Sequence, residues 1–287
     1  MNTLGEHATT PAAALQEEQL FDLEIRLLLE AVYQRWQHDF RDYAISSLRR
    51  RMRQAMAHFH CDSLSALQGR VLHEPEVFAQ MLQFFTVQVS EMFRDPSYFR
   101  ALREQVLPVL RTYPSLKIWV AGCSHGEEVW SLAILLAEEG LLSRTILYAT
   151  DINAAALQRA EAGIYPLDRV AGFSRNYLAA GGRGSLSDHY TSAYGGVAFD
   201  RRLKQQIVFA DHSLATDSVF SEVHFVSCRN VLIYFKRPLQ DRALGLFAEA
   251  LVRRGFLGLG LRETVQFSGH AGAFEPVVPD QRIYRKV

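Results

Sequence analysis

The chain beyond Pro114 alternates short apolar runs with amphipathic stretches, and this alternation constrains the fold more than any other feature. The runs are KIWVAG, RTILYAT, EVHFVS and FLGLGL, and the stretches include EEVWSLAILLAEE and PLQDRALGLFAEALVRR. Strands that alternate with helices are typical of a mostly parallel, doubly wound sheet. The pattern therefore predicts an α/β fold with such a sheet, in which a ligand binds beyond the carboxyl ends of the strands.

The region before this alternation has a helical spacing of apolar residues. From Phe21 to about Phe85 such residues recur every three to five positions, as in Leu23, Leu27 and Val32, with few helix breakers. This spacing predicts a small α-helical domain.

These patterns divide the chain into parts. We expect a disordered lead over residues 1–18, a helical domain over 19–90 and the α/β domain over 91–287. The stretch 179–205 interrupts the alternation, and its Gly195–Gly196 pair favours a hairpin turn. A small antiparallel β-insertion is therefore expected there.

Composition and charge exclude several classes of protein. Hydrophobic residues make up 48% of 287 residues, and 31 basic residues balance 31 acidic ones, so no overall charge attracts nucleic acid or an anionic membrane. The cysteines Cys61, Cys123 and Cys228 lack metal-ligand spacing, which predicts no metal site. Because no signal core and no run of about 20 apolar residues is present, we expect a cytoplasmic protein without membrane insertion.

The first candidate site follows the first predicted strand, in AGCSHGEE. Gly122 and Gly126 permit close approach of a ligand to the backbone, and Glu127 and Glu128 begin the next helix. Carboxylates there repel phosphate and suit a cationic ligand, although they also complement a helix dipole. Both interpretations remain open for the two glutamates.

Polar residues also follow other strands. Asp151, after RTILYAT, is placed to accept hydrogen bonds from ribose hydroxyls, and a helix N-cap is the alternative. Arg229, Asn230 and Tyr234 follow EVHFVS, where they can bind a substrate, although Tyr234 could also be a core residue. Arg94 lies near the expected domain junction, beside Asp95–Pro96, where a surface salt bridge is the alternative.

A basic cluster occupies the expected helix in YAISSLRRRMRQAMAHF. At about 100° per residue, Arg49 and Arg53 share one helix face and Arg50 projects from another. The cluster is interpreted as a docking stripe for an acidic partner, with a solvated helix face and nucleic-acid backbone binding as alternatives.

Four segments in order, VSEMFRDPSYF, AGCSHGEE, ATDINAAALQRAEAGIY and SCRNVLIYF, make the chain resemble the chemotaxis protein methyltransferase (CheR) family over roughly residues 20–287. The resemblance implies a helical domain followed by a methyltransferase domain of Rossmann-like topology with a small β-insertion. It implies an S-adenosylmethionine-dependent enzyme that forms methyl esters on glutamate side chains of chemoreceptors and releases S-adenosylhomocysteine. It implies receptor cytoplasmic helices as partners, a receptor carboxyl-terminal tail as a further partner of the β-insertion, and no nucleic acid.

The resemblance also implies roles for individual residues. Arg94 and Tyr234 would be catalytic, Glu128 would face the methionine amino group, and Asp151 would hold the ribose. The implied cofactor set is Gln88, Ser90, Arg94, Gly122, Glu128, Asp151, Ser213, Leu214, Arg229 and Asn230.

Some of these positions depart from the family pattern. Gln88 and Ser213 stand where asparagine is common, Ser90 where threonine is common, and His125 where a small hydroxyl residue is common. A methyltransferase for another acceptor and a cofactor-binding regulatory module with little turnover are therefore the alternatives.

Overall fold

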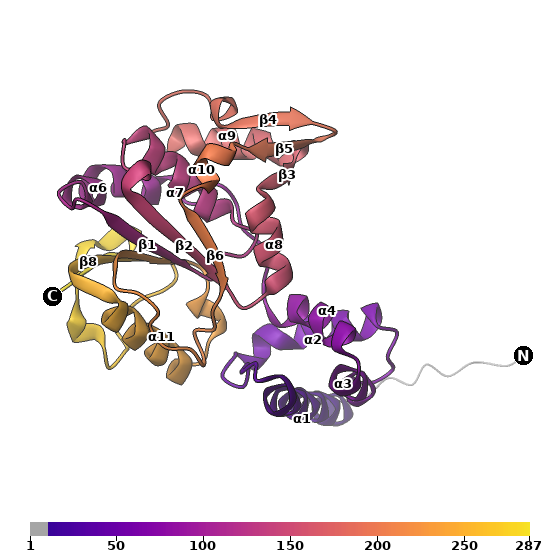
Figure 1. The fold of residues 1–287 in the computed structure, drawn as a ribbon. Helices are drawn as coiled ribbons and strands as arrows, with labels where there is room; N and C mark the ends of the chain where they lie inside the picture. Colours follow the sequence, from indigo (N-terminus) through magenta and orange to yellow (C-terminus); the bar gives the residue numbers. More distant parts are fainter. Residues whose placement is uncertain (1–10) are drawn as a thin grey trace, which may run out of the picture. The chain divides into compact units, whose positions relative to one another are not determined.

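The computed structural model describes residues 11–287, with side chains from residue 15 onward (Figure 1). The chain divides into two compact units between Thr86 and Val87, so the helical unit ends before residue 90. The expected disordered lead is wrong for residues 11–18, because helix α1 begins at Pro11. The rest of that lead, residues 1–10, lies outside the described residues.

The first unit is helical, as expected. Its helices are α1 (Pro11–Trp36), α2 (Ile45–His58), α3 (Leu64–His73) and α4 (Pro75–Phe85). The buried face of α1 carries Ile25, Leu28 and Val32, whereas Leu23 and Leu27 are 46% and 52% exposed. The helical period was predicted correctly, but these two leucines lie outside the core.

The second unit contains a seven-stranded sheet with the order β6-β2-β1-β7-β8-β10-β9. Strands β6, β2, β1, β7 and β8 are parallel, and β10 is antiparallel to both of its neighbours. The strands are β1 (Leu116–Ala121), β2 (Thr145–Asp151), β6 (Ile207–Asp211), β7 (Val223–Cys228), β8 (Leu251–Leu259), β9 (Phe274–Val278) and β10 (Ile283–Lys286). This is the predicted Rossmann-like architecture.

Helices connect the strands and cover the sheet (Figure 1). They are α5 (Pro96–Ala101), α6 (Leu107–Leu110), α7 (Glu127–Glu138), α8 (Ala154–Ala162), α9 (Leu167–Ala179), α10 (Arg201–Lys204) and α11 (Arg237–Ala250). A π-helical turn, Leu102–Val106, joins α5 to α6. The helix expected over PLQDRALGLFAEALVRR is shorter than predicted, because β8 already begins at Leu251.

Side chains alternate between the two faces of the sheet. On β1, Ile118 and Val120 join the core cluster that includes Leu132 of α7. Trp119 points to the other face, where its ring lies 5.4 Å from that of Phe247 on α11. Strands buried on both faces have to be apolar throughout, which explains the continuous apolar runs in the sequence.

The β-insertion is present but longer than expected. Its sheet has the order β3-β5-β4, formed by β3 (Ile164–Pro166), β5 (Gly196–Phe199) and β4 (Tyr190–Ala193), so it begins well before residue 179. The hairpin turn is Tyr194–Gly195, one residue earlier than predicted, and both residues have positive φ. Such a turn matches the twist of the paired strands.

Among the described residues, no helix combines the length and apolar character required to cross a membrane.

Candidate functional site

The strand order reverses between β1 and β7, and the predicted site residues gather around this point. From β1 the chain continues to β2 on one side, whereas β7 and β8 lie on the other. Gly122 follows β1 with φ of 70°, and a Cβ atom there would lie 2.6 Å from Cγ2 of Val231, which follows β7. Only glycine therefore permits this approach of the two loops.

Asp151 ends β2 and is buried. Its Oδ2 accepts a hydrogen bond from the backbone N–H of Ser124 at 2.8 Å, and Oδ1 accepts one from that of Asn153 at 2.9 Å. Burial raises the pKa of Asp151, and these bonds oppose the rise. The N-cap of α8 is Asn153, whose side chain accepts from the N–H of Ala156, so Asp151 is not the capping residue.

Arg229, at the end of β7, connects three segments of the site. Its side chain is 1% exposed and lies over the ring of Tyr98, 4.0 Å from the ring centroid. Nη1 donates to Glu128 Oε2 at 3.0 Å, and Nη2 donates to Asp95 Oδ2 at 2.8 Å. Nη2 also donates to the carbonyl of Arg94 at 2.9 Å. One guanidinium thus faces two carboxylates, so the cluster of Arg229, Glu128 and Asp95 has a net negative charge.

Glu128 is held from two sides. Its Oε1 accepts from the hydroxyl of Ser227 at 2.6 Å, and that hydroxyl also lies 3.0 Å from the Tyr98 hydroxyl. The Glu128 side chain is 14% exposed. An anion in this setting is fixed in position before any ligand arrives, which favours binding of a cation.

Its neighbour Glu127 has a different environment. The Glu127 side chain is 1% exposed, and its Oε1 accepts from Nη1 of Arg169 on α9 at 2.7 Å. The other Arg169 nitrogen donates to the carbonyl of Ser90. Arg169 was missed by sequence reasoning because it lies in the insertion and not after a strand of the main sheet.

Gln88 also lies at this edge of the sheet. Its Oε1 accepts from the hydroxyl of Ser124 at 2.6 Å, and the backbone N–H of Ser124 binds Asp151. The structure therefore brings together Gln88, Ser90, Gly122, Glu128, Asp151 and Arg229 through hydrogen bonds and close contacts.

Ser213 and Leu214 follow β6, the next strand along the same edge. The backbone N–H of Ser213 donates to Asp217 at 2.9 Å, and Leu214 is 8% exposed. Because β6 pairs with β2 in register from Leu147 to Asp151, this loop lies beside Asp151.

Arg94 and Tyr234 lie in two segments that the hydrogen bonds of Arg229 join, the segment before α5 and the loop after β7. The carbonyl of Arg94 accepts a hydrogen bond from Arg229, and the next residue, Asp95, has φ of 56°. Tyr234 ends a 3-10 turn, Leu232–Tyr234, in the loop that begins at Arg229. Both residues are partly exposed.

Glu263, which sequence reasoning missed, fixes the loop that follows β7. Glu263 follows β8, and its side chain is buried. Its two carboxylate oxygens accept backbone N–H groups from the loop after β7 and from the residue directly after β8. The donors are Asn230 at 3.0 Å, Val231 at 2.9 Å, Ile233 at 3.3 Å and Gly260 at 2.6 Å. Burial raises the pKa of Glu263, and these four bonds oppose the rise.

Asn230 is held in the αL conformation with φ of 61°. Asparagine tolerates this backbone geometry better than most residues with a side chain. The Glu263 contacts therefore set the shape of the segment from Asn230 to Ile233.

The predicted docking arginines lie on α2 in the first unit. Arg49 donates to both carboxylate oxygens of Asp22 at 2.7 Å, and this bond lowers the pKa of Asp22. Arg53 lies over the ring of Phe21, whereas Arg50 is exposed. Arg49 therefore forms an ion pair within its own unit, and Arg50 and Arg53 are the more exposed of the three arginines.

No group of three or more His, Cys, Asp or Glu side chains among residues 11–287 could hold a metal ion.

The fold and the site define a protein that binds a nucleoside-containing cofactor across the switch point of a Rossmann-like sheet. The buried acceptors of Asp151 and the glycine at residue 122 fit such a group. Residues 88–282 match the family described as CheR methyltransferase, SAM binding domain, and residues 23–86 match the CheR methyltransferase, all-alpha domain. The chain belongs to the CheR methyltransferase family, which uses S-adenosylmethionine.

Several relatives support this assignment. A Pseudomonas putida protein called Cher3, provisionally named a methyltransferase, is 57% identical over 95% of this chain and 100% of its own length. A chemotaxis protein methyltransferase of Listeria monocytogenes is 31% identical over 65% of this chain and 69% of its own. Chemotaxis protein methyltransferase 2 of Pseudomonas aeruginosa is 30% identical over 69% of each chain.

Proposed function

We propose that this protein transfers a methyl group from S-adenosylmethionine to glutamate side chains of chemoreceptor-type proteins and releases S-adenosylhomocysteine. The observation that carries the proposal is the presence of both CheR domains in one chain. Relatives that are named chemotaxis protein methyltransferases add support.

The negative charge of the site suits this cofactor. S-adenosylmethionine would supply a methyl group on a cationic sulfur, next to a cationic amino group. Glu128 and Asp95 outnumber the guanidinium of Arg229 in the buried cluster, so a cation is favoured there. We assign Glu128 to the amino group and Asp151 to the ribose hydroxyls.

The remaining predicted residues complete the proposed cofactor site. We assign Ser213 and Leu214 to the adenine side, because they follow β6 beside Asp151. The other assigned residues are Gln88, Ser90, Arg94, Gly122, Arg229 and Asn230.

The reaction requires little acid–base chemistry from the chain. A glutamate carboxylate has an ordinary pKa of about 4.3, so it is ionised at neutral pH and needs no general base. Its oxygen forms the new bond to the methyl carbon as the carbon–sulfur bond breaks, and the electron pair of that bond stays on sulfur. The protein's task is to align these atoms and exclude water.

We assign this alignment to Arg94 and Tyr234. The Arg94 guanidinium can hold the acceptor carboxylate by charge-assisted hydrogen bonds, and the Tyr234 hydroxyl can orient either reactant. Their backbone segments are both fixed by the Arg229 and Glu263 contacts.

The proposed partner is the cytoplasmic helical region of a chemoreceptor, which places the protein in the cytoplasm. On α2, we assign Arg49, Arg50 and Arg53 to acidic receptor helices. Arg50 and Arg53 are exposed, the latter over the ring of Phe21, and Arg49 also pairs with Asp22. The β-insertion offers β4 as an edge strand for a receptor tail, because β4 pairs only with β5 within the described residues.

The proposal is tested by incubating the full chain with methyl-labelled cofactor and membranes of the source cell. Base-labile label that maps to glutamates of a coiled-coil receptor is the expected result. Base-stable label on nucleic acid or on a small molecule would instead assign another acceptor. Calorimetric cofactor binding without any label transfer would favour a regulatory module.

A further inference from the structure

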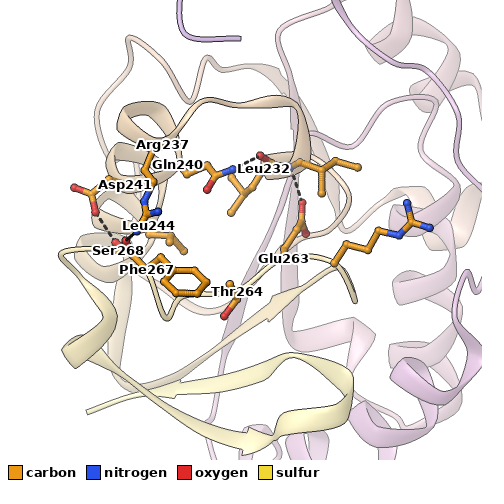
Figure 2. A pocket seen from close by; sticks show the side chains of 11 residues that line it. Leu232, Arg237, Gln240, Asp241, Leu244, Glu263, Thr264, Phe267 and Ser268 are labelled. Carbon is orange, nitrogen blue, oxygen red and sulfur yellow. Dashed lines mark hydrogen bonds between the residues drawn. The ribbon is translucent and has the colours of Figure 1, made fainter. Parts of the chain in front are cut away.

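A pocket lies beside the proposed methyl-transfer position, between the loops that follow β7 and β8 (Figure 2). Its cavity volume is about 90 Å³, and its lining includes Leu232, Ile233, Arg237, Arg262, Thr264 and Phe267. Strands β7 and β8 are adjacent and parallel, with Cys228 paired to Leu259, so their following loops meet at the same edge of the sheet.

The pocket and the proposed cofactor site lie on opposite sides of β7. Gly122, Asp151 and Ser213 follow β1, β2 and β6, which all lie to one side of β7 in the sheet. The pocket lies on the β8 side, and its lining residue Ile233 directly precedes Tyr234. An acceptor that meets the methyl group near Tyr234 can therefore approach over the pocket without crossing the cofactor.

The acidic residues in the pocket wall are already satisfied. Glu263 accepts four backbone N–H groups, and Asp241 accepts from the Ser268 hydroxyl at 2.6 Å and the Gly269 N–H at 2.7 Å. Figure 2 shows Asp241 directed at Ser268 and Glu263 directed at the backbone. Neither carboxylate pairs with an arginine of the pocket.

The basic residues of the pocket remain available. Arg237 lies over the Phe267 ring, 5.2 Å from its centroid, and donates to the Phe267 carbonyl at 3.1 Å. Arg262 is exposed and makes no hydrogen bond or ion pair among residues 11–287. The pocket therefore presents Arg262, which pairs with no side-chain anion of the described chain, beside Arg237, which attracts the Asp241 carboxylate without a hydrogen bond to it.

Apolar side chains surround these charges. Ile233, Leu261 and Phe267 are 38%, 42% and 69% exposed, and all three belong to the two loops that form the pocket. Exposed apolar residues beside arginines that form no ion pair match one face of an amphipathic acidic helix, in which residues three or four apart lie together.

We propose that this pocket is an acceptor subsite that binds a second acidic side chain, one helical turn from the glutamate that is methylated. The inference rests on the proposed function and specifies its substrate as a helix with carboxylates at i and i+4. One turn spans about 5.4 Å, so both carboxylates lie on one helix face, one at Tyr234 and the other at Arg237 and Arg262.

The test uses the full chain and two labelled synthetic helical peptides of about 20 residues on an alanine-rich background. One peptide carries glutamate at i and i+4, and the other carries glutamate at i and glutamine at i+4. The protein variants are Arg237→Glu and Arg262→Glu. Arg253→Glu is the matched control, because Arg253 is exposed on β8 but lies near the opposite end of that strand.

Fluorescence anisotropy with S-adenosylhomocysteine present is the first measurement. We expect the wild-type protein and Arg253→Glu to bind the double-glutamate peptide about tenfold more tightly than the glutamate–glutamine peptide. Both pocket variants should lose this preference. Methyl transfer to the same peptide should show a KM raised about tenfold in the pocket variants, with kcat nearly unchanged.

The outcomes separate this inference from the proposed function. An equal preference for the double-glutamate peptide in all four proteins would overturn the subsite. A preference that depends on Arg237 and Arg262, without methyl ester in the wild-type reaction, would keep the subsite and reject the proposed activity. Circular dichroism and cofactor calorimetry on each variant show that folding and cofactor binding are retained.

Discussion

Arg229 directly follows β7, Glu128 lies in the first turn of α7, and Nη1 of Arg229 lies 3.0 Å from Oε2 of Glu128. The Arg229 side chain is only 1% exposed. Removal of Arg229 would leave the Glu128 and Asp95 carboxylates facing each other without a counter-charge. We expect Arg229→Ala to lower the free energy of unfolding by about 3 kcal/mol, as for other buried ion pairs that lose one partner. Urea unfolding measures this, and Arg253→Ala, at an exposed position, should change it by less than about 0.5 kcal/mol. Equal stability of the two variants would show that the buried cluster tolerates unpaired charge.

Asp151→Ala should weaken binding of S-adenosylhomocysteine by about 1 to 3 kcal/mol, because polar groups of the ligand would lose their acceptor. Calorimetry measures the change. Asp151→Asn retains one acceptor oxygen and should lie between the wild type and the alanine variant. Unchanged affinity in both variants would remove Asp151 from the cofactor site.

Glu263→Gln should disturb the loop from Asn230 to Ile233. The amide N–H₂ of glutamine would face backbone N–H groups that now donate to the carboxylate. We expect a loss of about 2 kcal/mol in the free energy of unfolding. We also expect a lower kcat for methyl transfer, because Tyr234 belongs to the same loop. A loss of stability with kcat unchanged would limit Glu263 to a structural role.

Arg50 and Arg49 should differ as docking residues. Arg50→Glu should raise the apparent KM for receptor methylation and weaken its dependence on ionic strength, because screening acts over about 8 Å at physiological salt. Arg49→Glu should in addition lower stability, since it replaces the ion pair with Asp22 by repulsion. A wild-type KM and salt response in Arg50→Glu would contradict docking at α2.

The lowered pKa of Glu138 predicts that the stability of the protein depends on pH. Burial alone would raise the pKa of Glu138, but hydrogen bonds from His189, Tyr177 and Arg103 lower it from 4.5 to about 2. A carboxyl with a lowered folded-state pKa stabilises the fold above its unfolded pKa and loses this contribution as the pH falls toward 2.

Glu138→Gln should therefore destabilise the protein by a constant amount between pH 7 and about pH 5. The difference from the wild type should shrink below pH 4.5, the ordinary pKa of this carboxyl. Urea midpoints across this range measure it. Glu104→Gln, at an exposed position on the preceding helical segment, should give no such pH-dependent difference.

The main sheet could be predicted wherever strands are buried on both faces. Continuous apolar runs marked β1, β2, β7 and β8, and all four are present. Strands β9 and β10 were not predicted, because each is short and carries charged residues, such as Glu275 and Arg285, that pair with each other at 2.7 Å. Charged cross-strand pairs leave no apolar alternation to recognise.

The place of a residue could be predicted where it lies at the carboxyl end of a strand of the main sheet. Gly122 and Arg229 directly follow β1 and β7, Asp151 is the last residue of β2, and the topology brings these strand ends to one edge of the sheet. Glu263 could not be found in this way, because its partners are backbone N–H groups, which every sequence contains. The ion pair of Arg49 could not be predicted for a related reason, since Asp22 lies on another helix, 27 residues away.

The Glu263 contacts also set an order of events during protein synthesis. Every residue that we assign to the cofactor precedes Val231, but the carboxylate that holds Asn230 lies 33 residues further along the chain. A nascent chain that has been synthesised as far as Asn230 thus contains all the residues that we assign to the cofactor. The loop that begins at Asn230, however, does not yet have the carboxylate that fixes its shape. We therefore expect this loop to reach its final shape only after α11, β8 and Glu263 have been made.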